Sequence, residues 1–312
     1  MDKVWFKQII AENYIFNFKN VDEEDEIYNI FFQNDKYLKI SYDKDFWNIF
    51  DLLGMKYRLV NKEIVITKND SVYKSLDRGT HIYRINNMSP WKGLIIKKPK
   101  YKIQYYKFDS NRNKIYNSRI IENVSTVVNP RTTNFIRQVQ NTLYIKLKSF
   151  NNIDQFDFMG LEPSDEIIVD LRDNMGGLTK EAILFLDFFF KKNTVLFYLK
   201  SKKNIFKITS KTPAAVKYKK IYIFVNRNTF SSSEIVVNVI KRKLDNVIIV
   251  GDRTGGKNVT TRIFKYKNFY LKIPCFIYSV EQDFDPINGK VTPDYFISEK
   301  TMNRFLKKRV NI

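Results

Sequence analysis

Three short apolar runs that alternate with two helical stretches constrain the fold of this chain most strongly. Residues 167–171, 221–225 and 247–250 are almost continuously apolar, which is typical of strands buried on both faces of a sheet. The stretches between them, residues 179–190 and 232–244, predict helices. A strand–helix–strand–helix–strand order predicts parallel pairing with right-handed crossovers, and therefore an α/β fold.

The first half of the chain has a different pattern. Short helices are expected at residues 2–12 and 44–53, and strand-like runs separated by turn residues follow between about residues 55 and 125. These runs include 63–66, 81–85 and 102–106, and later strands are expected at 143–147 and, as a hairpin, at 262–266 and 269–273. We therefore expect a helical segment over residues 1–50, a small β-rich module over 51–128 and an α/β core over 129–312.

Composition limits the classes of function. Of the 312 residues, 44% are hydrophobic and 15% are aromatic, so the chain can bury a core and general disorder is excluded. One cysteine, Cys275, allows no intrachain disulfide framework, and with one histidine, His81, it leaves few ligands for a transition metal. Asp283 and Asp285 are the remaining candidate metal ligands, but we expect them to lie in a solvated loop rather than at a metal site. We expect no cofactor and no metal ion.

The net charge of +21 has two explanations. It could attract an acidic partner such as nucleic acid, or it could reflect AT-rich codons, which also encode the abundant Asn, Ile, Tyr and Phe. Because the lysines are scattered, we expect no specific nucleic-acid partner.

No segment predicts a membrane span. Residues 1–20 contain no apolar export signal, so we expect a cytoplasmic protein if Met1 is the natural start, and an exported protein if a leader has been removed.

Three loops follow the carboxyl ends of the predicted parallel strands, where reactive groups collect in such sheets. They contain the pair Gly176–Gly177, the serine Ser231 and the lysine Lys257. A serine nucleophile needs a base, and because histidine is nearly absent we assign that role to Lys257. The alternative base, His81, could serve only if the β-rich module folded over the sheet.

Each of these residues also has a purely structural explanation. Ser231 and Glu234 match a helix capping box, the glycine pair matches a tight turn, and an exposed lysine with a pKa near ~10.4 is no base at neutral pH. The explanations are compatible with catalysis, because a helix that starts at Ser231 leaves backbone N–H groups free for an oxyanion. We expect Ser232 to supply one such N–H, and Gly176 or Gly177 the other.

Four segments, taken in order, resemble the C-terminal processing peptidases, or tail-specific proteases, of serine peptidase family S41. They are the strand and glycine loop at 169–177, the serine segment at 225–234, the lysine loop at 250–257 and the closing residues 291–294. The resemblance covers about residues 143–297. It implies a crotonase-like (ClpP/crotonase-type) α/β core, a catalytic dyad of Ser231 and Lys257, and no cofactor.

The resemblance also implies a PDZ-like module ahead of the core, because residues 78–87 are similar to a PDZ segment. PDZ modules bind peptides as an added strand and hold a C-terminal carboxylate on backbone N–H groups. Many family members carry a glutamine four residues after the lysine. Here that position is Thr261, which is the candidate third catalytic residue.

The resemblance predicts a serine endopeptidase that cleaves flexible polypeptides, and it implies that the enzyme engages them at their C-termini. Ser231 would attack the scissile carbonyl, Lys257 would take its proton, and backbone N–H groups would hold the oxyanion. The alternative is an inactive protein that binds a peptide or another ligand, because the same fold carries non-proteolytic relatives. The sequence leaves the oligomeric state open.

Overall fold

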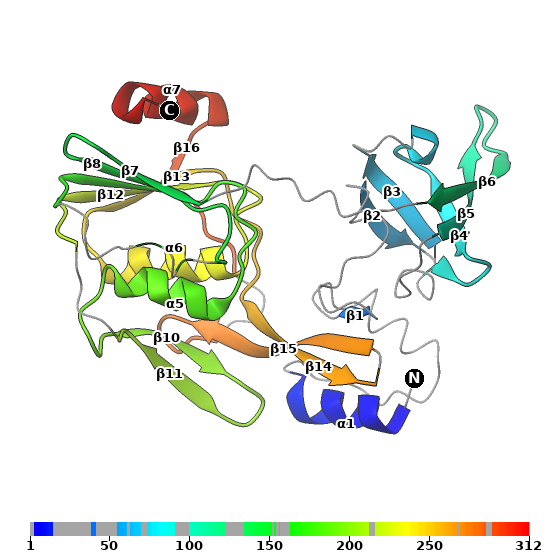
Figure 1. Cartoon of the computed structure of the whole chain (residues 1–312), viewed down its shortest axis with the longest axis horizontal. Coiled ribbons are helices and arrows are strands. Elements are labelled where there is room, and N and C mark those ends of the chain that lie inside the picture. The colour runs from blue at the N-terminus through cyan, green and yellow to red at the C-terminus, as the bar shows by residue number, and fades with distance from the viewer. Residues whose placement is uncertain are drawn as a thin grey trace. The chain divides into compact units, whose positions relative to one another are not determined.

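A computed structural model describes this chain at residues 3–14, 39–41, 55–60, 63–69, 74–90, 100–122, 134–151, 153, 156, 163–211, 216–267, 269–284 and 289–311 (Figure 1). The chain forms two compact units. The first comprises Met1–Asn129 and Thr261–Pro274, and the second comprises Pro130–Thr260 and Cys275–Ile312. Residues 261–274, which the sequence analysis assigned to the core segment, therefore group with the first unit.

The first unit contains a five-stranded antiparallel sheet in the order β2-β3-β4-β5-β6. Its strands are β2 (Met55–Val60), β3 (Glu63–Asn69), β4 (His81–Ile85), β5 (Lys100–Phe108) and β6 (Lys114–Glu122). The three strands expected at 63–66, 81–85 and 102–106 are thus confirmed. Their inward-facing residues form a core of their own with Ile64, Ile82, Ile103 and Ile121, which are fully buried.

Outside this sheet, the expected helix at residues 2–12 is confirmed as α1 (Lys3–Asn13), whereas 44–53 lies outside the described residues. The expected hairpin is confirmed as β14 (Val259–Tyr266) and β15 (Phe269–Ser279), and β1 (Lys39–Ser41) pairs with β15. The far end of β15 pairs with β10 (Val195–Lys200), which forms a second hairpin with β11 (Ile205–Thr209).

The second unit is built on a six-stranded sheet in the order β16-β13-β12-β9-β8-β7. The strands are β7 (Phe135–Val139), β8 (Thr142–Lys146), β9 (Glu166–Asp170), β12 (Lys220–Val225), β13 (Val247–Gly251) and β16 (Tyr295–Phe296). All neighbouring pairs from β8 to β16 are parallel, and only the edge strand β7 is antiparallel. The predicted parallel sheet is therefore confirmed.

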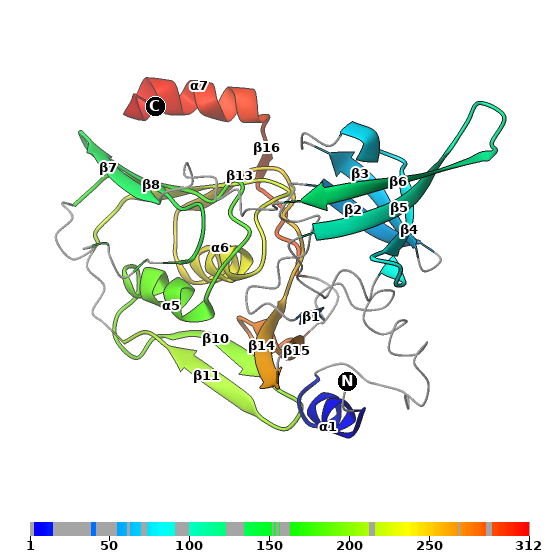
Figure 2. The same ribbon diagram turned by 45° about the vertical axis from the view of Figure 1, so that its right-hand side comes forward.

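Helices cover both faces of this sheet. The two crossover helices, α5 (Thr179–Asp187) and α6 (Ser232–Lys243), lie side by side on one face, between this sheet and the hairpin β10–β11 (Figure 1). The helix α7 (Glu299–Val310) crosses the opposite face, which Figure 2 shows from the side. α7 has no counterpart among the helices expected from the sequence.

Alternate residues of each central strand face these two layers. Ile167, Val169 and Ile223 pack with the α5 and α6 side, whereas Ile168 and Phe224 pack with α7. All five are at most 2% exposed. Burial on both faces explains why these strands appear in the sequence as continuous apolar runs rather than alternating ones.

Candidate active site

The three predicted loops meet at one edge of the six-stranded sheet. They follow β9, β12 and β13, which are parallel neighbours, so their carboxyl ends lie on the same side. Contact between the first two loops is close: a Cβ atom added to Gly176 would lie 2.8 Å from the Phe230 carbonyl oxygen and 2.9 Å from the Ser231 Cβ. A side chain at position 176 would therefore displace the serine turn.

Ser231 occupies a strained turn between β12 and α6. Its backbone angles, φ 60° and ψ −120°, lie in a region that residues with a Cβ atom rarely adopt, at a cost of about 1–3 kcal/mol. Hydrogen bonds hold the turn, because the Phe230 N–H donates to the Asn174 carbonyl at 2.9 Å and the Glu234 N–H donates to the Ser231 carbonyl at 2.8 Å. A serine on a sharp strand-to-helix turn is the geometry of a nucleophile elbow.

Glu234 connects this turn to the lysine loop. Its carboxylate is fully buried and accepts four hydrogen bonds, which come from the N–H groups of Ser231 (2.9 Å), Gly256 (2.6 Å) and Lys257 (2.7 Å) and from the Thr254 hydroxyl. The N–H groups of Ser231 and Lys257 share the same oxygen, Oε2. Burial raises the pKa of Glu234, and the four donors counteract this effect.

In the sequence, Glu234 is recognisable only as part of a capping box. The capping contact is present, because the Glu234 carboxylate accepts from the N–H of Ser231, the N-cap residue. The same carboxylate also accepts hydrogen bonds from a loop that lies twenty or more residues further along the chain. The Ser-x-x-Glu pattern was the available signal for the residue, but it carries no information on this second partner.

Phe230 brings the lysine loop against the serine turn. Its ring packs against Gly255, where an added Cβ would be 2.2 Å from the nearest ring carbon, and the Gly255 N–H donates to the Thr229 carbonyl at 2.9 Å. The Lys257 amine lies 5.9 Å from the centroid of the same ring. The amine of a half-buried lysine therefore has an aromatic surface beside it, supplied by the residue that precedes Ser231.

The two glycine N–H groups of the loop differ in their hydrogen bonding. The Gly176 N–H donates to the Asn174 side chain at 2.9 Å. By contrast, the N–H groups of Gly177 and Ser232 donate to no other residue in the described part of the chain. The Ser232 hydroxyl donates to the Gly177 carbonyl at 2.9 Å, which fastens this part of the loop to the start of α6. Gly177 and Ser232 are thus the candidate oxyanion donors in this geometry.

The conformation of Gly177 also requires a glycine. Its φ is +153°, and an added Cβ would lie 2.3 Å from the Phe150 carbonyl oxygen. The backbones are bonded on both sides of this contact, since the Phe150 N–H donates to Gly176 and the Phe150 carbonyl accepts from Leu178. The missing side chains of the glycine pair therefore allow the loop backbone to lie close to the serine turn on one side and to Phe150 on the other.

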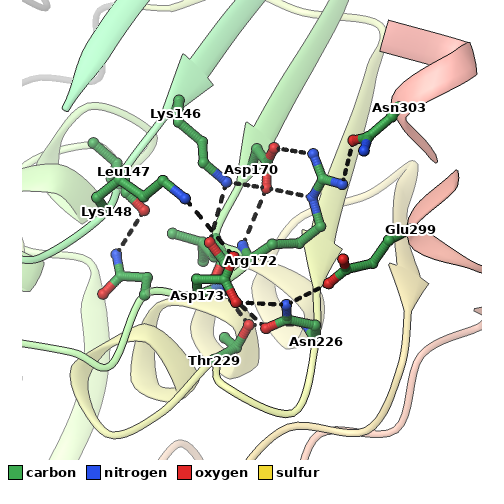
Figure 3. A network of polar contacts seen from close by, with 12 residues as sticks. Lys146, Leu147, Lys148, Asp170, Arg172, Asp173, Asn226, Thr229, Glu299 and Asn303 are labelled. Atoms are coloured by element: carbon green, nitrogen blue, oxygen red, sulfur yellow. Dashed lines mark hydrogen bonds and ion pairs between the residues drawn. The ribbon is translucent and has the colours of Figure 1, made fainter. Parts of the chain in front are cut away.

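A buried group of charges supports the start of the glycine loop (Figure 3). Asp170, at the end of β9, is fully buried and pairs with Lys146 at 2.7 Å and with Arg172 at 2.6 Å. Lys146 also donates to the Arg172 carbonyl at 3.1 Å, and the Tyr144 hydroxyl donates to Asp170 at 2.9 Å. These contacts fix the backbone at Arg172, where the chain leaves the sheet.

Burial and neighbouring charges shift the pKa values of Lys146 and Asp170. Burial lowers the pKa of Lys146 to about 8, although Asp170 opposes the shift, and the neighbouring Lys148 and Arg172 add to it. The pKa of Asp170 is lowered instead, because hydrogen bonds and charges from Arg172 and Lys146 outweigh its burial. At neutral pH all three side chains are therefore charged.

We predict that Lys146 makes stability depend on pH above neutrality. Because its folded-state pKa of about 8 lies below the unfolded value of 10.5, the unfolded chain binds more protons between these limits. Relative to Lys146→Met, the free energy of unfolding of the natural chain should rise by roughly 2–3 kcal/mol from pH 7 to pH 10. Urea denaturation of both proteins across this range measures the difference. A constant difference would contradict the prediction.

The remaining candidate residues belong to other strands and loops of the chain. Thr261 is half-buried in β14 and groups with the first unit, and its role stays a prediction. His81 is engaged within its own sheet, with Nδ1 3.2 Å from the Glu63 carboxylate and its ring stacked on Tyr106. Cys275 is buried and unbridged, the Asp283 carboxylate accepts from the Ser279 hydroxyl, and Asp285 lies outside the described residues.

Within the described ranges, His, Cys, Asp and Glu side chains form no group of three or more that could hold a metal ion. No helix there is both long and apolar enough to cross a bilayer.

Comparison with known proteins gives consistent matches. The sequence pattern described as "Peptidase family S41" matches residues 141–297. Carboxyl-terminal-processing peptidase 1 from the chloroplast of Arabidopsis thaliana is 26% identical over 167 residues, which are 49% of this chain and 32% of that protein. A CtpA-like serine protease of Staphylococcus saprophyticus is 31% identical over 145 residues, which are 43% of this chain and 28% of that protein. The matched segments span about a third of these relatives.

Solved structures match nearly the whole chain. An S41 protease from Bacteroides fragilis is similar with a TM-score of 0.57 and 16% identity, over 96% of this chain and 92% of that chain. The photosystem II D1 C-terminal processing protease is similar with a TM-score of 0.54 and 13% identity, over 96% of this chain and 87% of that chain. At these identities the likeness concerns the fold, and it confirms the predicted fold class.

Proposed function

This chain belongs to peptidase family S41, and on that basis we propose that it is a serine endopeptidase with Ser231 as nucleophile and Lys257 as base. The observation that supports the pairing most is the Glu234 carboxylate, because a single oxygen of it holds the N–H groups of both residues. The strained backbone at Ser231 also supports it, since strain of this kind persists where the surrounding structure enforces it and clusters at active sites.

The proposed reaction begins at Ser231. The neutral amine of Lys257 takes the hydroxyl proton while Oγ attacks the carbonyl carbon of the substrate peptide bond. The carbonyl oxygen becomes negative and accepts hydrogen bonds from the N–H groups of Gly177 and Ser232, which also benefit from the positive end of α6. The protonated lysine then donates its proton to the leaving amine as the carbon–nitrogen bond breaks.

A water molecule completes the cycle. Lys257, neutral again, takes a proton from the water that attacks the acyl-serine ester, and it returns that proton to the Ser231 oxygen when the ester bond breaks. The products are an amine and a carboxylate, and the enzyme is restored. The role requires a lysine that is neutral at the working pH, because only the neutral amine can accept the serine proton.

For the substrate we propose a flexible polypeptide that is engaged at its C-terminus. The names of the matched relatives describe carboxyl-terminal processing. The five-stranded sheet of the first unit occupies the segment where the family resemblance predicts a PDZ-like module. We propose that this sheet holds the C-terminal residues of the substrate as an added strand.

Labelling with a fluorophosphonate tests the proposed function. This probe phosphonylates an activated serine, and peptide mapping should locate the adduct on Ser231. Ser231→Ala should not be labelled, whereas Ser201→Ala, which removes a loop hydroxyl away from the site, should react like the natural chain. If the natural chain reacts no faster than Ser231→Ala, the protein is no serine peptidase and the binding alternative replaces the proposal.

We predict that Gly176→Ala slows this labelling by a factor on the order of 10². The added methyl group would meet the serine turn at distances below 3 Å, so Ser231 must move. Gly79→Ala is a matched control, because Gly79 has nearly the same φ (90° against 94°) and an added Cβ there would meet nothing within 4 Å. Both variants carry the backbone strain, and only Gly176→Ala should lose labelling rate. Equal rates for the two would refute the close contact.

A further inference from the structure

The helix α7 begins directly after the residues that the family pattern matches. Met302, Leu306 and Val310, spaced by four residues, are buried against the outer face of the six-stranded sheet. At the far end of the helix, Arg309 pairs with Glu166 at 2.9 Å. The helix is therefore docked along its whole length, with a fixed orientation on the sheet.

The near end of α7 contacts the support of the glycine loop (Figure 3). Glu299 and Asn303 lie one turn apart on the helix and face the same way. Glu299 accepts a hydrogen bond from the Asn226 side chain at 2.9 Å, and Asn303 accepts one from the Arg172 guanidinium at 2.7 Å.

Both partners hold the first residues of the glycine loop. Arg172 opens the glycine loop, and two of its guanidinium nitrogens bind the buried Asp170 carboxylate at 2.6 and 2.9 Å. Asn226 accepts from the Asp173 N–H at 3.0 Å and donates to the Asp173 carboxylate at 3.0 Å. Asp173 has a φ of +62°, which a residue other than glycine seldom adopts, so these contacts hold it in a strained turn.

The turn at Asp173 sets the position of the glycines that follow. Asn174 is fully buried, and its side chain donates to the Leu147 carbonyl at 3.0 Å while accepting from the Gly176 N–H. A buried ion group is costly and is often replaced by apolar residues without loss of stability. Here the buried ions are hydrogen-bonded to the first residues of the glycine loop. We therefore infer that their main role is to hold the loop in position rather than to stabilise the fold.

We propose that α7 positions the glycine loop for the acylation step, with Glu299 and Asn303 as positioning residues that act through Asn226 and Arg172. The proposal rests on the proposed function, because the exact place of the Gly177 N–H matters only if it stabilises an oxyanion. Loss of both contacts frees the Asp173 turn, and the donor at Gly177 is then misplaced in the transition state while the probe still binds.

The test is fluorophosphonate labelling of the full chain as a function of probe concentration. The variant Glu299→Ala/Asn303→Ala should lower the limiting rate constant about tenfold and leave the half-saturating probe concentration unchanged. The conservative variant Glu299→Gln/Asn303→Asp keeps both acceptors and should restore the rate to within about twofold. Lys300→Ala/Lys307→Ala changes two exposed residues of the same helix and should have no effect.

The final labelled fraction separates folding from positioning. Misfolded molecules lower this fraction, whereas a misplaced loop lowers only the rate. A limiting rate within twofold of the natural chain for Glu299→Ala/Asn303→Ala would overturn the role of α7 and leave the proposed function intact. Failure of the natural chain to react at Ser231 would instead refute the proposed function.

Discussion

Lys257→Met should lower the rate of Ser231 phosphonylation at pH 7 by a factor on the order of 10²–10⁴, which is the usual contribution of a general base. Methionine has nearly the length of lysine without the amine, so the hydrogen bond from the backbone N–H of residue 257 to Glu234 should persist. Cleavage of an unfolded polypeptide such as casein should fall by a similar factor. Fluorophosphonate labelling quenched at a series of times measures the first rate, and casein hydrolysis measures the second.

Two further variants distinguish a base from a positive charge. Lys257→Arg keeps the charge, but a guanidinium does not lose its proton at any working pH, so it should not restore the rate. Lys207→Met removes an exposed lysine of β11 and should label like the natural chain. Full activity in Lys257→Arg would show that the site needs a cation there and not a base.

Glu234→Ala should destabilise the second unit by about 3–5 kcal/mol, because it leaves buried donors without an acceptor. The N–H groups of Ser231, Gly256 and Lys257 would all lose their partner. For a unit of this size the melting temperature should fall by roughly 10 °C. Differential scanning calorimetry measures this shift, and labelling of the folded fraction at low temperature should also be slowed, since the serine turn and the lysine loop lose their common anchor.

Glu234→Gln is the sharper form of this test. An amide has one acceptor oxygen, so its NH₂ group must face at least one backbone N–H that now binds the carboxylate. We therefore expect Glu234→Gln to lose most of the stability that Glu234→Ala loses. The control is Glu281→Gln, which changes an exposed carboxylate that pairs with Arg242 on the surface. A melting temperature for Glu234→Gln within about 2 °C of the natural chain would contradict the anchoring role.

Local patterns in the sequence predicted the centre of the fold. The runs at 167–171, 221–225 and 247–250 are strands because apolar side chains fill both faces of the sheet there, and this condition is visible in three to five consecutive letters. The same order of strands and helices placed the three loops at one edge. These predictions succeeded because each depends on residues close together in the chain.

Elements with a weaker signature were missed. α7 is rich in lysine and arginine, and its apolar stripe consists of three buried residues, Met302, Leu306 and Val310. The hairpin of β10 and β11 has partly exposed strands, such as Ile205 and Phe206, whose burial pattern does not alternate cleanly. Such elements are stabilised by packing on the rest of the unit. The surface on which they pack is formed by residues distant in the chain, so a local stretch of sequence does not reveal it.

The partners of individual side chains were also beyond the sequence. The local motif Ser-x-x-Glu predicts only the capping role of Glu234, whereas its hydrogen bonds with Gly256 and Lys257 depend on how two loops meet. The buried pair of Lys146 and Asp170 joins neighbouring parallel strands, and the register that aligns them cannot be read from either strand alone. The sequence thus indicates the candidate residues, whereas packing determines their partners.

One measurement tests the dyad most directly: the pH dependence of Ser231 phosphonylation when the amine at position 257 is replaced by a chemically different one. Lys257→Cys, made in a chain that carries Cys275→Ala, can be alkylated with bromoethylamine to give a side chain of lysine length whose sulfur lowers the basicity of the amine. Before alkylation this variant should be nearly unreactive. After alkylation the rate should recover, with its pH midpoint below that of the natural chain. A variant that is fully reactive before alkylation, or a midpoint that does not move, would show that the amine at position 257 is not the base.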